Sequence, residues 1–128
     1  MKYDLRLVAV NLRDYPGSTP YTAEELAALS NPDPTIQAKA FRSQAEQLVA
    51  FLEYFIKQNN IPKLKEFGGT RSGGLVVLTW SMSNVISFSF LGEADTFPRT
   101  TRNLLGEYLR TVVLFGKEPE LAIQRPAS

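Results

Sequence analysis

The sequence predicts an α+β domain in which helices pack on one face of a small sheet. Residues 34–59 space their apolar side chains by three and four positions, which is typical of a helix facing a core. Residues 3–12 and 85–91 alternate apolar and polar side chains over part or all of their length, as half-buried strands do. With a further strand between them, the predicted order is β-α-α-β-β-α, a two-layer sandwich with a three-stranded mixed sheet.

The first predicted element is a strand from Tyr3 to Leu12. Leu5 and Leu7 alternate with Asp4 and Arg6, and the apolar side then shifts, as expected where a strand becomes buried. Because two helices follow before the next strand, this first strand can lie parallel to a later one. We expect it to pair with one of the two later strands.

A short helix should follow from Ala23 to about Leu29. The stretch 15–21 contains two prolines and a glycine and is predicted as a loop. Thr22 and Glu25 have the spacing of a capping box, in which each side chain satisfies a free amide at the helix start. The prolines within 31–34 end the helix.

The main helix is predicted from about Pro34 to Asn59, with Asp33 as its N-cap and a proline preset for the first turn. Tyr54 lies on the side of this helix opposite the core. It is either an ordinary exposed tyrosine or an anchor for a partner. The core-facing side chains are Phe41, Ala45, Leu48, Val49, Leu52, Phe55 and Ile56.

The glycine-rich stretch 68–74 is predicted as a flexible loop, with Arg71 at its tip as a potential anion contact. It lacks the spacing of a phosphate-binding loop and leads into a strand rather than a helix. Strands at 75–81 and 85–91 should form an antiparallel hairpin. Its second face mixes apolar residues with serines and threonines, so a partner could meet it.

A last helix is predicted from about Pro98 to Phe115, with Gly116 as its C-terminal cap. The domain would then span residues 1–116, and residues 117–128 would be a C-terminal tail. The side chains expected to be largely buried are Leu48, Leu52, Phe55, Leu78, Trp80, Phe88, Leu105 and Tyr108.

Composition excludes several functional classes. The 128 residues contain no cysteine and no histidine, which removes disulfides, Cys/His zinc sites, thiol nucleophiles and a Ser-His-Asp triad. Fourteen basic and thirteen acidic residues give a net charge of +1, so no global field attracts nucleic acid or anionic lipid. The sequence shows no apolar run long enough for a membrane span and no signal-peptide core, so we expect a cytoplasmic protein without membrane partners.

A basic stripe is predicted on the last helix. Arg99, Arg102, Arg110 and Lys117 fall on one side of the helical wheel, opposite the core face. Such a row suits phosphate oxygens or an acidic protein surface. A solvated polar face is the alternative explanation.

Two carboxylates, Glu93 and Asp95, lie two positions apart after a predicted strand end and are weak candidates for a metal site. Magnesium needs further oxygen ligands or a substrate phosphate, and roles in turns and caps also explain the pair. The serines lack an available base, so the sequence identifies no catalytic residue and no cofactor.

These observations favour a non-catalytic interaction module, a small subunit of a larger protein or nucleoprotein assembly. Its partner would be another protein or a second copy of the chain. The alternative is a nucleic-acid or phosphate-ligand binding protein that uses the basic residues named above. A metal-dependent enzyme is the third hypothesis.

Overall fold

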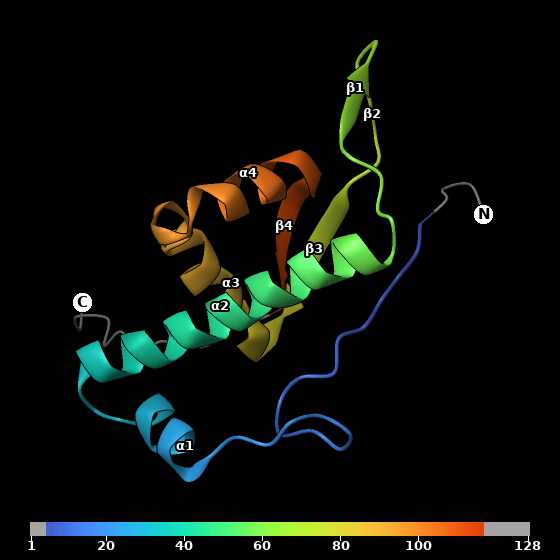
Figure 1. Ribbon diagram of the computed structural model, residues 1–128. Coiled ribbons are helices and arrows are strands. Elements are labelled where there is room, and N and C mark those ends of the chain that lie inside the picture. The colour runs from blue at the N-terminus through green and yellow to red at the C-terminus, as the bar shows by residue number, and fades with distance from the viewer. Residues whose placement is uncertain (1–4, 117–128) are drawn as a thin grey trace, which may run out of the picture.

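The computed structural model describes residues 5–116 and has the α+β class that the sequence predicts (Figure 1). Its elements are α1 (Ala23–Leu29), α2 (Pro34–Gln58), β1 (Lys65–Phe67), β2 (Thr70–Ser72), β3 (Leu75–Trp80), η1 (Ser81–Ser83), α3 (Asn84–Gly92), η2 (Ala94–Thr96), α4 (Arg99–Tyr108) and β4 (Leu109–Phe115).

The two predicted N-terminal helices are confirmed together with their caps. The Thr22 hydroxyl accepts a hydrogen bond from the Glu25 amide at 3.1 Å, and the Glu25 carboxylate accepts one from the Thr22 amide at 2.8 Å. At the start of α2, the Asp33 carboxylate accepts from the Thr35 amide at 2.9 Å. These bonds satisfy amides that have no partner within the first helical turn.

Strands β3 and β4 pair in parallel, with Val77 opposite Val112, while β1 and β2 form a separate antiparallel hairpin. Within residues 5–116 there are two two-stranded sheets, and the predicted three-stranded mixed sheet is not seen. In Figure 1, α2 crosses in front of β3 and β4, and the β1–β2 hairpin projects away from the rest of the fold. The core cluster consists of Ala45, Val49, Leu52, Val77, Phe90, Phe97 and Leu105.

The predicted strand at 85–91 is wrong, because this stretch belongs to helix α3. Asn84, Ser87 and Phe90 are buried, and their spacing of three positions gives the helix one inward face. The Thr79 hydroxyl donates to Asn84 Oδ1 at 2.9 Å and lies within hydrogen-bond distance of the Ser87 hydroxyl. Strand β3 therefore supplies a polar partner to the buried polar residues of α3. The alternation predicts Ser87 on the wet face of a strand, which the helix contradicts.

The predicted last helix is also wrong beyond Tyr108, where the chain changes from α4 to β4. The stretch 109–115 contains threonine and two adjacent valines, which favour extended backbone. Pairing with β3 gives hydrogen-bond partners to the backbone groups along one edge of β4. Gly116, predicted as a helix cap, follows a strand instead and has a φ of 97°.

Two further predictions differ from the structure: the first strand and the glycine-rich loop. Residues 5–12 contain no strand, although a strand was predicted from Tyr3 to Leu12. The predicted flexible loop at 68–74 instead contains the turn and second strand of the β1–β2 hairpin. Gly68 and Gly69 form its turn with φ values of 58° and 78°, the positive values that a two-residue hairpin turn favours.

The expected core is confirmed only in part. Leu52 and Leu105 are buried, and Leu48, Phe55 and Tyr108 are half-buried. The prediction of burial is wrong for Leu78, Trp80 and Phe88, which are exposed.

Candidate functional site

The sheet formed by β3 and β4 has one covered face and one open face. Side chains alternate along β3, so Leu75 and Val77 pack on the helices while their neighbours point away from them. The parallel register places Leu78 beside Val113 and Trp80 beside Phe115. We use "open face" for the large apolar side chains on the outer side: Val76, Leu78, Trp80, Val113 and Phe115.

The open face is both apolar and exposed. Leu78 is 59% exposed, Trp80 is 63% exposed and Phe115 is 53% exposed. The Trp80 and Phe115 rings meet edge to face with centroids 5.0 Å apart, so the two strands present them as one surface. Parallel strands are ordinarily covered on both faces, and contiguous apolar patches of this kind mark interaction sites.

The N-terminal segment, residues 5–12, is a second exposed apolar feature. Leu5 and Leu7 are 76% and 95% exposed, and Val8, Val10 and Leu12 are exposed as well. Residues 5–10 make no backbone hydrogen bond to any residue within 5–116. The segment therefore keeps the composition of a strand without a strand partner in this part of the chain.

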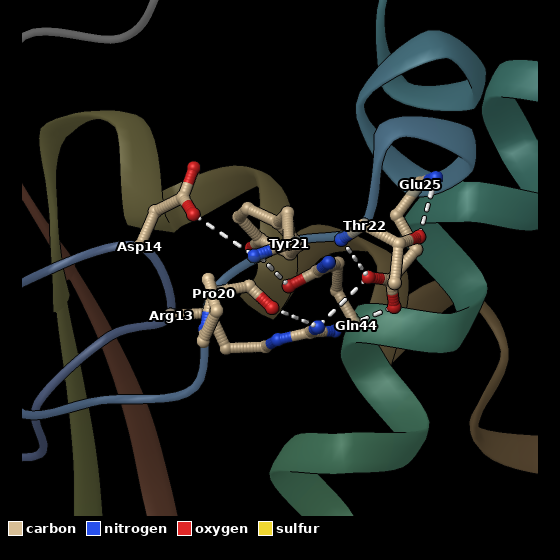
Figure 2. Close-up of polar contacts among 7 residues, drawn as sticks. All are labelled: Arg13, Asp14, Pro20, Tyr21, Thr22, Glu25 and Gln44. Carbon is tan, nitrogen blue, oxygen red and sulfur yellow. Dashed lines mark hydrogen bonds and ion pairs between the residues drawn. The ribbon is translucent and has the colours of Figure 1, made fainter.

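The end of this segment is anchored by Arg13 (Figure 2). Its two terminal nitrogens donate to the Glu25 carboxylate at 2.6 and 2.8 Å, and one of them also donates to the Pro20 carbonyl at 2.9 Å. The guanidinium lies 4.5 Å from the centre of the Tyr21 ring, a cation–π contact. The ion pair is bidentate, so it fixes the orientation of the Arg13 guanidinium as well as its distance from the Glu25 carboxylate.

Tyr21 connects this anchor to α2. Its hydroxyl donates to Gln44 Oε1 at 2.9 Å, and its amide donates to the Asp14 carboxylate at 2.9 Å (Figure 2). The loop between the N-terminal segment and α1 is thus attached to two helices. The N-terminal segment is therefore joined to a loop whose position is fixed on α1 and α2.

We expect this anchor to weaken in acid. The Arg13 hydrogen bonds, followed by the Thr22 amide, lower the pKa of Glu25 to about 2, below its ordinary value of 4.5. Because the pKa is lowered by folding, the stabilisation is complete above about pH 4.5 and is lost as the pH falls toward 2. A carboxyl titration followed by NMR should show Glu25 titrating near 2, and Arg13→Gln should raise that value toward 4.5. An unchanged value in the variant would show that Arg13 is not the cause.

A basic hollow lies between the β1–β2 hairpin and β4. It has a volume of about 360 Å³ and is lined by Leu64, Lys65, Glu66, Arg71 and Arg110. Arg110 Nη2 donates to the Arg71 carbonyl at 3.3 Å, which brings together two residues that the sequence nominated separately as anion contacts. Arg71 Nε lies 3.8 Å from the Glu66 carboxylate. Three cationic side chains and one carboxylate therefore border the hollow.

The other nominated basic residues do not form one stripe with Arg110. Arg99 and Arg102 are exposed near the start of α4, whereas Arg110 belongs to β4. Neither of the first two makes an ion pair with any residue in 5–116. Lys117 lies outside the described residues. Tyr54 is 62% exposed on α2, the exposure that its helical position predicts.

The two nominated metal ligands have different surroundings. The Glu93 carboxylate accepts from Arg42 Nη1 at 2.7 Å, and Asp95 is exposed in η2. No group of three potential metal-ligating side chains occurs among residues 5–116. Over the same residues, none of the helices has the length and apolar character to cross a membrane.

Comparison with protein-family models, curated proteins and solved structures gives no match for this chain. The functional candidates are therefore the open face, the N-terminal segment and the basic hollow. Sequence reasoning expected a partner on one face of the sheet but assigned the wrong face, because it placed Leu78 and Trp80 in the core. The strand-like composition of residues 5–12 was recognised, but their exposure was not.

Proposed function

We propose that this protein is a non-catalytic interaction module, a small subunit of a larger protein assembly, and that it docks through the open face. The observation that carries the proposal is the contiguous exposure of Leu78, Trp80 and Phe115 on two paired strands. The open face contains no charged side chain. Its partner should therefore present an apolar surface.

The size of the open face supports association. The exposed parts of its two aromatic side chains amount to roughly 200 Å². The three aliphatic side chains bring the apolar area to on the order of 300–400 Å². Covering this area would contribute several kcal/mol before the costs of association are subtracted. A monomer gains nothing from leaving it in water.

The first test compares the native mass of the chain in its source lysate with the mass of the purified chain. We expect the lysate form to exceed 14.3 kDa, the mass of one chain. Leu78→Lys should reduce it toward the single-chain mass, because docking would bury an unpaired charge. The melting temperature should hardly change, because Leu78 is exposed.

The matched control is Leu26→Lys, which makes the same change at another exposed leucine, on α1. It should keep the large native mass. If the wild-type chain has the mass of a monomer in the lysate, the proposal is wrong. Equal effects of the two variants would contradict the role of the open face.

The basic hollow favours a second candidate function, binding of a nucleic acid or another phosphate ligand. Arg71 and Arg110 come from positions 39 residues apart and border one hollow together with Lys65. Arginine and lysine side chains in such an arrangement suit phosphate oxygens. Arg99 and Arg102, on α4, are a separate pair of possible contacts.

A fluorescence titration with labelled single-stranded DNA at two salt concentrations tests this candidate. We expect affinity to fall steeply with salt, and Arg71→Glu combined with Arg110→Glu should weaken binding at least tenfold because attraction becomes repulsion. Both side chains are exposed, so the melting temperature should change little. Lys39→Glu combined with Lys57→Glu, which reverses two exposed charges on α2 away from the hollow, is the matched control and should leave binding nearly unchanged. Absence of binding at low salt would end this candidate.

A further inference from the structure

We infer that two copies of this chain associate by exchanging their N-terminal segments, each segment adding as a strand to the β3–β4 sheet of the other copy. This inference rests on the proposed function and identifies its partner as a second copy. Three independent features carry it: the residue pattern of the segment, its unsatisfied backbone and the position of its anchor.

The residue pattern of the segment matches that of the strands it would join. Residues 5–10 read Leu-Arg-Leu-Val-Ala-Val, and β3 reads Leu-Val-Val-Leu-Thr-Trp. Both are nearly continuous apolar runs, the pattern of strands that are covered on both faces. A strand that alternates strictly would suit a sheet with one wet face. The segment therefore fits a sheet that has a core on one side and a covered open face on the other.

Within residues 5–116, both the segment and the edges of the sheet have backbone groups without hydrogen-bond partners. Residues 5–10 have no backbone hydrogen bonds within the described chain. Each strand of the two-stranded sheet has one outer edge, and no other strand within residues 5–116 pairs with either edge. An extended segment that adds to a sheet edge satisfies both sets of groups through main-chain hydrogen bonds.

The anchor favours a second copy over the segment's own sheet. Arg13 and Tyr21 hold the end of the segment on α1 and α2, and Figure 1 shows residues 5–12 as a trace that runs clear of β3 and β4. Within residues 5–116, one chain thus carries both an extended segment without backbone partners and a sheet with two unpaired edges. In a two-fold dimer, the segment of each copy pairs with the sheet of the other copy. Two-fold symmetry is the common form of homodimers.

The area required for a stable dimer also favours exchange. A standard interface buries about 800 Å² per partner, and two open faces packed against each other would supply only roughly half of that on each side. The five exposed apolar side chains of the segment enlarge the contact on each side. They are Leu5, Leu7, Val8, Val10 and Leu12.

The test measures the mass of the purified full chain by analytical ultracentrifugation over a range of concentrations. We expect a reversible equilibrium between 14.3 kDa and twice that mass. Leu78→Lys, which alters the acceptor, and Leu7→Asp with Val10→Asp, which alters the segment, should each raise the dissociation constant about 100-fold. Leu26→Lys is the control that should leave it unchanged. Circular dichroism establishes that each variant folds.

Mixing the two impaired variants is the sharper experiment. The segment variant keeps an intact sheet and the acceptor variant keeps an intact segment, so the mixture should regain a dimer with one exchanged strand. Because the chain contains no cysteine, Val8→Cys and Val76→Cys can also be mixed and joined by a short bismaleimide. We expect a crosslink between copies from this pair. Val8→Cys mixed with Ala27→Cys on α1 is the control and should not crosslink.

Three results would overturn the exchange. In the first, the chain is monomeric at every concentration and its residues 5–12 are protected from amide exchange by their own sheet. In the second, the dimer is lost in Leu78→Lys but kept in the segment variant, so that the open faces meet without exchange. In the third, the purified chain is monomeric and only the lysate form is large. This last result keeps the proposed function and assigns it a different partner.

Discussion

Truncating Leu52 to alanine is expected to lower the free energy of unfolding by about 2–5 kcal/mol. Leu52 is 5% exposed on α2 and belongs to the core cluster with Val49, Phe90 and Leu105. The substitution removes apolar contacts and leaves a cavity between α2 and the elements packed on it. In a domain of this size the loss would be a large share of total stability.

Chemical denaturation of the full chain measures this effect, with Ile36→Ala as the matched control. Ile36 lies on the same helix but is 41% exposed, so its truncation should cost less than about 1 kcal/mol. Leu52 lies where the helical periodicity predicted a buried residue. A loss below about 1 kcal/mol for Leu52→Ala would mean that α2 presents a different face to the core.

The predictions that succeeded depend on signals that are local in the chain. The length of α2 gives its apolar stripe several turns, and the Thr22–Glu25 box and Asp33 cap are read from a few neighbouring residues. Such signals do not depend on which segments meet in the fold. The α+β class and both N-terminal helices could therefore be predicted from the sequence.

The predictions that failed concern segments whose structure depends on a distant partner. The pattern of 85–91 is short enough to fit a strand or a helix, and the Thr79–Asn84 hydrogen bond is visible only in the fold. Residues 109–115 continue an apolar pattern that also fits the end of α4. Their pairing with β3 decides in favour of a strand.

For the candidate site too, single residues could be predicted from local signals, whereas contacts between distant segments could not. Arg71 and Arg110 could each be nominated by charge, but their approach across the hollow depends on the unpredicted hairpin and on β4. The open face exists because β3 pairs with β4 in parallel and no described element covers its outer side. Without that pairing, Leu78 and Trp80 resemble ordinary core residues.

The second large effect is expected from Gly73→Ala, at the base of the β1–β2 hairpin. Gly73 has a φ of 72°, a conformation that costs a side-chain-bearing residue about 1–2 kcal/mol. A Cβ atom there would also overlap the Lys63 carbonyl oxygen and lie 3.1 Å from the Pro62 carbonyl oxygen. Both neighbours are backbone, so neither can rotate away. Together the two effects should destabilise the protein by about 2–5 kcal/mol.

Gly68→Ala separates these two effects. Gly68 also has a positive φ, 58°, but no atom lies within 4 Å of the position that its Cβ would occupy. Thermal and chemical denaturation should therefore show a loss of only about 1–2 kcal/mol for Gly68→Ala. The difference between the two variants measures the close approach of Gly73 to residues 62–63. Because the Gly74 amide donates to the Pro62 carbonyl at 2.7 Å, that approach joins the end of α2 to the start of β3. Equal losses would show that the base of the hairpin shifts freely and does not hold β3 in register.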